Sequence, residues 1–262
     1  MLDWLPLSFP AMLFLCAMVG LAGFVDAAAG GGGLIALPAY MAVGLPMHYV
    51  YGCNKLSSAV GTTFSTARFF KNGALELKVG LAAAAASFMG SALASQVVLL
   101  LPDASLKLIL LVMLPVVAVV TLRNHNWPDE PTPMDFRRRA AVVWAASLVI
   151  GAYDGYYGPG TGTFLMLIFI RLGKMDTRHA AGGVKVINLA SNIGSLCTAL
   201  TAGTVYIAVG LIAAIASVLG HYLGAGLAIK NGSRIVRPTV IIVLILLTVK
   251  VGSELLFPEF WS

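Results

Sequence analysis

The chain is dominated by long apolar runs that are interrupted by glycine, proline and charged residues. A helix needs about 20 residues to cross a bilayer, and most of these runs are long enough. Two of them, at 33–45 and 160–172, are too short to cross upright, and each follows a glycine-rich break. The ten predicted helical segments are 5–29, 33–45, 50–70, 79–101, 105–122, 137–157, 160–172, 180–202, 204–229 and 235–257.

The composition narrows the class of protein further. Of the 262 residues, 59% are hydrophobic and 11% are charged, whereas a soluble domain has about 45–50% apolar and about 25% charged residues. Too few charged side chains remain to cover a water-soluble globule. We therefore exclude a soluble enzyme, a nucleic-acid-binding protein and a secreted disulfide scaffold, and we expect an all-α polytopic membrane protein.

The ten segments form two groups of five that have the same order of sizes. Residue identities also recur: Asp26 matches Asp154 at an offset of 128, and Lys55 matches Lys185 at an offset of 130. The same offset of 130 pairs Ser87-x-x-Gly90 with Ser217-x-x-Gly220. We predict a first transmembrane repeat over 1–130 and a second over 131–262. Each would hold a glycine-broken or re-entrant helix pair plus three spanning helices.

The cations predict the orientation of the two repeats. Basic residues concentrate in cytoplasmic loops, and here 13 of the 17 lysines and arginines fall in four clusters. All four clusters are cytoplasmic if both termini lie outside, and the two repeats are then inverted relative to each other. Inverted repeats are typical of secondary transporters. The clusters are Arg68, Lys71 and Lys78; Arg123 and Arg137 to Arg139; Arg171, Lys174 and Arg178; Lys230, Arg234 and Arg237.

One aspartate and one lysine in each half are placed deep in the apolar segments, away from the basic clusters: Asp26 and Lys55, and Asp154 and Lys185. A charge at the centre of a membrane helix costs about 2.5–3.5 kcal/mol on insertion scales, and such groups face each other or a cavity. One interpretation is an Asp–Lys pair within each half that cross-links helices. The other is a polar pathway between the repeats, in which the aspartates orient the lysines or carry a coupling proton.

The glycine breaks favour the pathway, because backbone of this kind at membrane depth must be buried in protein or line a cavity. The N–H groups at a helix N-terminus form an anion site. The N-terminal groups expected to bind a small anion, together with Lys55 and Lys185, are Gly31, Gly32, Gly33, Gly158, Gly160 and Thr161.

Polar residues in the segments that contain the lysines extend this candidate site. Asn54 precedes Lys55, and Asn188 and Asn192 lie on the same helix face as Lys185. Hydrogen bonding between helices is the alternative role for such residues. His221 lies between Gly220 and Gly224, where a structural role is the simpler interpretation. No catalytic, metal-ligating or nucleotide-binding arrangement is visible, so we expect neither an enzyme nor a cofactor.

At these residues the chain resembles the TauE/SafE sulfite exporter family, within the toluenesulfonate uptake permease superfamily. The resemblance rests on G-F-V-D-A-A-A-G-G-G-G-L-I at 23–35, on Asn54-Lys55-Leu56, on G-A-Y-D-G-Y-Y-G-P-G at 151–160 and on the region of Lys185 and Ser191-Asn192-Ile193-Gly194. It covers essentially the whole chain and is strongest to an inner-membrane permease branch. The resemblance implies a multi-pass protein of a prokaryotic plasma (inner) membrane that transports small sulfur-containing anions such as sulfite, thiosulfate or organosulfonates.

The leading hypothesis is a secondary transporter, exporter or permease, for a small anion. The alternatives are a proton- or sodium-coupled carrier of a zwitterion or cation such as taurine, and a non-transport membrane assembly subunit. The expected partners are the anionic substrate and the lipid bilayer, with coupling to protons or sodium and no nucleic acid. A homodimer is left open.

Overall fold

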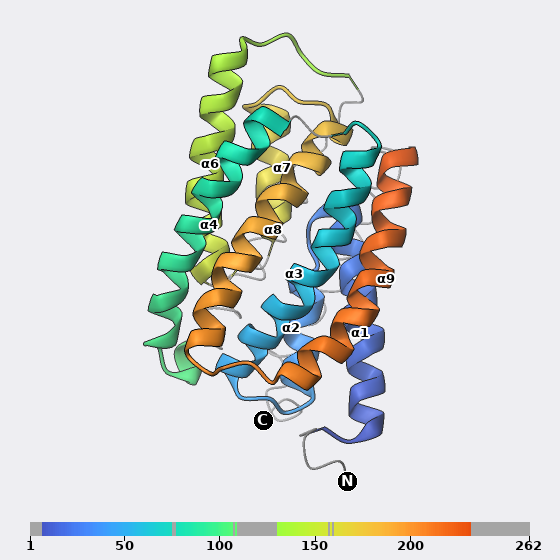
Figure 1. Ribbon diagram of the computed structural model, residues 1–262, viewed down its shortest axis with the longest axis vertical. Helices are drawn as coiled ribbons and strands as arrows, with labels where there is room; N and C mark the ends of the chain where they lie inside the picture. The colour runs from blue at the N-terminus through green and yellow to red at the C-terminus, as the bar shows by residue number, and fades with distance from the viewer. Residues whose placement is uncertain are drawn as a thin grey trace.

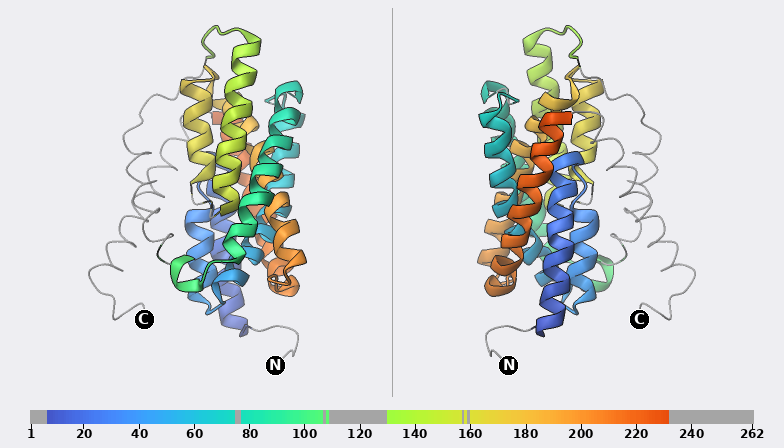
Figure 2. Two further views of the ribbon diagram at one scale, coloured as in Figure 1. Left: turned by 90° about the vertical axis from the view of Figure 1, so that its left-hand side faces the viewer. Right: turned by 90° about the vertical axis from the view of Figure 1, so that its right-hand side faces the viewer.

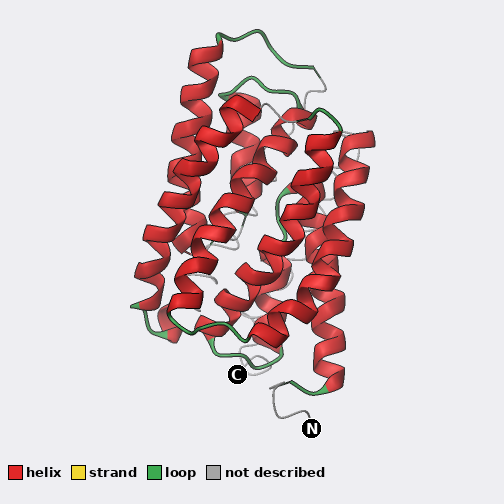
Figure 3. Ribbon diagram, viewed as in Figure 1, coloured by secondary structure: helices red, strands yellow, loops and turns green. Residues whose placement is uncertain are grey.

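Every regular element that the structure describes is an α-helix (Figure 3). The computed structural model describes residues 7–74, 77–106, 108, 130–156, 158 and 160–231. Its helices lie within about four residues of eight predicted segments, whereas the predicted segments 105–122 and 235–257 lie almost entirely outside the described residues. The helices are α1 (Phe9–Ala29), α2 (Gly33–Ala42), α3 (Met47–Lys71), α4 (Leu77–Leu99), α6 (Phe136–Tyr156), α7 (Thr161–Arg171), α8 (Thr177–Thr201) and α9 (Ile207–Asn231).

Local sequence signals explain where several helices begin and end. Ser8 and Asp176 are N-cap residues, and the Asp176 carboxylate accepts a hydrogen bond from the His179 amide at 2.9 Å. Helix α1 ends at Gly30, which has a φ of 74°, a left-handed conformation that glycine adopts without steric cost. Gly160, the residue directly before α7, is also left-handed, with a φ of 79°. The two glycine-rich breaks are therefore helix boundaries.

The short helices α2 and α7 are re-entrant. In Figure 1, α1 begins near the N-terminus at the lower end of the molecule, and α2 returns to that same end. Helix α6 begins at the upper end, and α7 returns to it. The two helical hairpins thus enter from opposite ends, and their glycine-rich tips lie inside the bundle.

The tips of the two hairpins touch each other. A Cβ atom on Gly30 would lie 2.5 Å from the carbonyl carbon of Gly162, and the Thr163 hydroxyl donates a hydrogen bond to the Gly30 carbonyl at 2.8 Å. Only residues without side chains allow two backbones to approach this closely. The glycine pair therefore fixes the distance between the hairpins.

The remaining helices interlock the two halves of the sequence. Helix α9 packs along α1, and α4 packs along α6, so the last described helix of each half covers the first helix of the other (Figure 2). Helices α3 and α8 contact each other; α9 packs on α3, and α4 packs on α8. Every one of these contacts between helices has a counterpart in the other half, as an inverted repeat would produce. The inverted repeat itself and its division at residue 130 stay predictions.

Three described helices are long and apolar enough to cross a membrane by length and composition: Phe9–Ala28, Gly80–Leu99 and Ile207–Asn231, with mean hydropathies of 2.0, 1.5 and 1.9. The central helices α3 and α8 have 25 residues each but are more polar. The polar residues therefore concentrate in the middle of the bundle.

The described cations concentrate at one end of the molecule. They lie near the ends of α3, α7 and α9 and near the beginnings of α4, α6 and α8, and all of these helix ends point upward in Figure 1. Only Lys55 and Lys185, among the lysines and arginines that the structure describes, lie deep inside helices. The clusters predicted from the sequence thus share one side, as far as they fall in the described residues.

Replacing Gly162 by alanine tests the contact between the hairpins. The new methyl group would collide with the Gly30 backbone, and overpacking of this kind costs about 1–3 kcal/mol. We expect a lower apparent melting temperature of the purified protein in detergent. The matched control is Gly80→Ala, because the nearest atom to its new methyl group is Val186 Cγ1 at 3.8 Å. Equal melting temperatures for the two variants would show that the hairpin tips do not touch.

Candidate functional site

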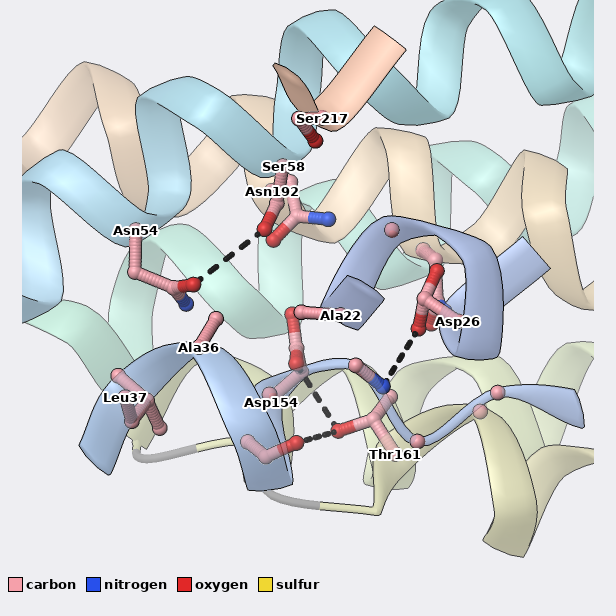
Figure 4. Close-up of a pocket in the computed structure, with 18 of the residues that line it drawn as sticks. Ala22, Asp26, Ala36, Leu37, Asn54, Ser58, Asp154, Thr161, Asn192 and Ser217 are labelled. Atoms are coloured by element: carbon pink, nitrogen blue, oxygen red, sulfur yellow. Dashed lines mark hydrogen bonds between the residues drawn. The ribbon is translucent and has the colours of Figure 1, made fainter. Parts of the chain in front are cut away.

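A polar cavity lies where the two hairpin tips meet α3, α8 and α9 (Figure 4). All but one of the site residues predicted from the sequence line it; the exception is Lys185. The predicted residues on its wall are Asp26, Gly31, Gly32, Gly33, Asn54, Lys55, Asp154, Gly158, Gly160, Thr161, Asn188 and Asn192. Segments far apart in the sequence therefore converge on one space.

Lys55 and Asp154 form a buried ion pair on the cavity wall. The Lys55 Nζ lies 2.7 Å from Asp154 Oδ2 and 2.9 Å from the Asp154 backbone carbonyl oxygen. The two side chains are 3% and 9% exposed. Burial at this level makes a lone charge very costly, so each partner requires the other.

Lys185 and Asp26 form the corresponding pair at 2.6 Å. The Lys185 side chain is 1% exposed and lies behind Asp26, whose carboxylate is 17% exposed and lines the cavity. Lys185 therefore supports the wall through Asp26 instead of lining the cavity itself.

Both ion pairs cross between the halves of the sequence. The interpretation of an Asp–Lys pair within each half is wrong, because Asp26 binds Lys185 and Asp154 binds Lys55. The cause is the interlocked packing: α9 covers α1 and α4 covers α6, so the ends of α1 and α6 come within reach of the lysines of α8 and α3. The ion pairs thus hold the two halves together at the cavity.

Each aspartate also holds the helix that follows it. Asp26 Oδ1 accepts a hydrogen bond from the Gly32 amide at 3.3 Å, and Asp154 Oδ1 accepts one from the Thr161 hydroxyl at 2.9 Å. Figure 4 shows both contacts. Each carboxylate thereby connects a lysine to the beginning of α2 or α7, which fixes the direction of these two helix N-termini.

The charges on the wall nearly cancel. Two lysines face two aspartates at ion-pair distance, so the pairs contribute little net charge to the cavity. Positive potential then comes from the helix N-termini, where the first N–H groups have no acceptor within the helix. Both α2 and α7 begin at the cavity.

Amide and hydroxyl groups complete the wall. Asn54 and Ser58 come from α3, and the Ser58 hydroxyl donates to Asn54 Oδ1 at 3.5 Å. Asn188 and Asn192 come from α8, where the Asn188 Oδ1 atom is buried without a hydrogen-bond partner among the described residues. These groups offer both donors and acceptors to a molecule inside the cavity.

Two site residues were not assigned to the site from the sequence. Ser217 and His221 of α9 line the cavity, and His221 Nε2 lies 3.3 Å from Asp26 Oδ2. The available signal was their spacing of four residues, which places two polar side chains on one face of an otherwise apolar helix. The sequence alone did not distinguish this from ordinary helix packing.

Comparison with known proteins identifies the family. The model of the family described as "Sulfite exporter TauE/SafE" matches residues 15–251. The chain belongs to the TauE/SafE family. No solved structure matches it significantly.

Three curated relatives cover nearly all of this TauE/SafE chain. A "probable membrane transporter protein ORF9" from Sinorhizobium sp. is 33% identical over 95% of each chain. A "probable membrane transporter protein" from Haemophilus influenzae is 32% identical over 92% of this chain and 93% of its own. The "probable membrane transporter protein YfcA" of Escherichia coli K12 is 31% identical over 94% and 92%. The chain is thus a multi-pass membrane protein of a transporter family.

A double-mutant cycle tests the crossed pairing. Asp154→Asn leaves Lys55 as an unpaired buried charge, which costs about 3–5 kcal/mol, so we expect a large loss of thermal stability in detergent. Adding Lys55→Met to that variant should restore part of the loss, because the unpaired charge is then removed. The control combines Asp154→Asn with Lys185→Met, two changes within the second half, and should lose more stability than either change alone. Restoration by Lys185→Met instead of Lys55→Met would contradict the crossed arrangement.

Proposed function

We propose that this protein is a secondary transporter for a small anion, most suitably a sulfur-containing one such as sulfite, thiosulfate or an organosulfonate. The observation that carries the proposal is the meeting of two re-entrant helix N-termini at one polar cavity inside the bundle. Discontinuous helices whose N-termini point at an anionic group are a recurrent feature of secondary transporters.

The wall of the cavity supports an anionic substrate. The N-termini of α2 and α7 supply the positive ends of two helix dipoles, and the side-chain amides of Asn188 and Asn192 add hydrogen-bond donors from α8. A sulfite or sulfonate group has three oxygen acceptors, which suits donors that converge from several helices. The two ion pairs have no net charge. They position these donors, and the substrate can still be released because the pairs do not attract it strongly.

Membership of this family supports a sulfur-containing substrate, because the family is described as a sulfite exporter. The motifs at 23–35 and 151–160, which carry the resemblance, form the two hairpin tips at the cavity. We therefore place the sulfur-containing anion at these tips.

The distribution of cations supports an orientation. Cytoplasmic ends of membrane proteins carry an excess of lysine and arginine, so the cation-rich end that is uppermost in Figure 1 would face the cytoplasm of a prokaryotic cell. The beginning of α1, at the opposite end of the molecule in Figure 1, would then face the outer side of the inner membrane.

One observation favours a zwitterion as a second candidate substrate. The buried Asn188 Oδ1 atom is an acceptor without a partner in the described residues, and the ammonium group of taurine would supply a donor to it. Competition experiments separate the two candidates: taurine would inhibit sulfonate uptake only if the site also accepts the ammonium group.

The proposal is tested by flux measurements on the purified protein in liposomes. We expect exchange of radiolabelled sulfite, thiosulfate or methanesulfonate across the membrane at rates above those of protein-free liposomes. Asn192→Ala removes a donor from the cavity wall and should reduce exchange at least about tenfold if a hydrogen bond worth about 1.5–3 kcal/mol to a charged group is lost. Its melting temperature should change little, because no described hydrogen bond depends on the Asn192 side chain.

The matched control is Thr201→Ala on the same helix. Thr201 is exposed near the end of α8, and its hydroxyl bonds only to the Thr198 carbonyl, at 2.9 Å, among the described contacts. Exchange should stay at the wild-type rate in this variant. Absence of exchange for all three anions in the wild-type protein would rule out the proposed function.

A further inference from the structure

His221 lies on the cavity wall beside one of the two ion pairs: its Nε2 atom is 3.3 Å from Asp26 Oδ2, which also binds Lys185. The residue is 2% exposed, and its ring lies against the backbone of two glycines. A Cβ atom on Gly23 would lie 2.6 Å from Nδ1, and one on Gly61 would lie 2.5 Å from it. Helices α1 and α3 thus lack side chains where the imidazole ring fits.

The hydrogen bonds of the ring show where a proton would bind. In the neutral ring with its hydrogen on Nδ1, that hydrogen has an acceptor, because Nδ1 lies 3.0 Å from the Ser217 backbone carbonyl oxygen, which only accepts hydrogen bonds. Nε2 is then an acceptor and lies 3.3 Å from both the Thr62 hydroxyl and Asp26 Oδ2. A second proton on Nε2 would convert the contact with Asp26 into a charge-assisted hydrogen bond.

The groups around the ring come from all three helices packed on α9. Asp26 of α1 faces Nε2, and Lys185 of α8 binds the same carboxylate oxygen at 2.6 Å. Helix α3 contributes Thr62 at the ring, and its Arg68 binds the carbonyl of Tyr222, the next residue along α9. Asp26 is therefore shared between the ammonium group of Lys185 and the imidazole ring of His221.

This arrangement occurs on one side of the cavity only. The sequence offset of 130 pairs His221 with Ser91, whose hydroxyl bonds to the Ser191 carbonyl and to the Ser195 hydroxyl. The ion pair of Lys55 and Asp154 therefore has no titratable neighbour at the corresponding position. The two otherwise similar ion pairs therefore differ in this neighbour: Lys185–Asp26 has an imidazole ring beside it, and Lys55–Asp154 does not.

We propose that His221 binds a coupling proton and that this proton crosses the membrane together with the anion, one proton for each monovalent anion. The proposal rests on the proposed anion transport. With His221 neutral, the two ion pairs leave the cavity without net charge; protonation of Nε2 gives it one positive charge. In a water-poor cavity that charge attracts an anion much more strongly than it would in bulk water.

The coupling is reciprocal. A proton on His221 raises the affinity for the anion, so a bound anion must raise the affinity of His221 for the proton by the same factor. Protein that has bound the anion therefore holds the proton more often than empty protein does. Transport of a monovalent anion is then electroneutral and is driven by a difference in pH across the membrane.

Methanesulfonate is the probe for the test, because it is monovalent and stays ionised near neutral pH. Purified protein is placed in liposomes that contain a pH-sensitive dye, and an outward or inward methanesulfonate gradient is applied. For the wild-type protein we expect proton movement in the direction of the anion. The initial rate of methanesulfonate uptake should not change when a potassium gradient with valinomycin sets the membrane potential.

His221→Gln keeps a hydrogen-bonding side chain but cannot take up a proton. We expect its methanesulfonate-dependent proton movement to fall to the level of protein-free liposomes, and its remaining anion flux to respond to the membrane potential. The matched control is His48→Gln, since His48 lies outside the cavity and contacts Asp103 at 3.5 Å. This control should keep wild-type proton movement.

Exchange of labelled for unlabelled methanesulfonate separates the two proposals, because exchange needs no net proton movement. Exchange without any proton movement in the wild-type protein would overturn the role of His221 while leaving anion transport intact. Undiminished proton movement in His221→Gln would overturn it as well. Absence of exchange in the wild-type protein would remove the proposed function itself. A melting curve shows whether His221→Gln is folded. If this variant is unfolded, the proton movement measured for the wild-type protein decides whether the anion and a proton are coupled.

Discussion

The arrangement of the described bundle depends on two buried lysine–aspartate contacts that connect opposite halves of the chain. Each lysine binds both the carboxylate and the backbone carbonyl of its aspartate, and each aspartate lies in the last turn of α1 or α6. The C-terminal end of a helix is its negative end, where a carboxylate is unfavourable and a cation is favourable. The lysine thus compensates two negative groups at once, which explains why a carboxylate is tolerated there.

Close backbone contacts keep the ion pairs in place. Lipid provides little hydrophobic driving force between helices, so membrane helices associate by close packing of small residues. Gly220 and Gly224 of α9 pack directly on the α1 backbone, and Gly151 and Gly155 of α6 pack on Ser87 and Ser91 of α4. These contacts bring α1 and α6 next to helices of the other half. Packing on α9 and α4 therefore holds α1 and α6 in place, and the ion pairs connect the ends of these two helices to α8 and α3.

Much of this architecture could be predicted from hydrophobic runs, glycine breaks and the positions of a few charges. Helix bounds and most of the cavity wall follow from local patterns. An aspartate or a lysine at membrane depth faces another buried group or a cavity, and a glycine break at that depth is buried in protein or lines a cavity. The partner of each lysine could not be predicted in this way, since it depends on which distant helix covers the hairpin. The place of His221 on the cavity wall could not be predicted for a similar reason, because its neighbours lie on other helices. These neighbours are Gly23 and Asp26 of α1 and Gly61 and Thr62 of α3.

The crossed pairing also has a consequence for how the protein is made. Asp26 is synthesised 159 residues before Lys185, and Lys55 is synthesised 99 residues before Asp154. When the first helices leave the ribosome and enter the membrane, neither charge has its final partner, and an unpaired charge at the centre of a helix costs about 2.5–3.5 kcal/mol. Asp26 and Lys55 therefore have no ion-pair partner of the final structure until α8 and α6 have been synthesised. Insertion and folding are one continuous process in such a chain, and the first half completes its structure only when the second half has been translated.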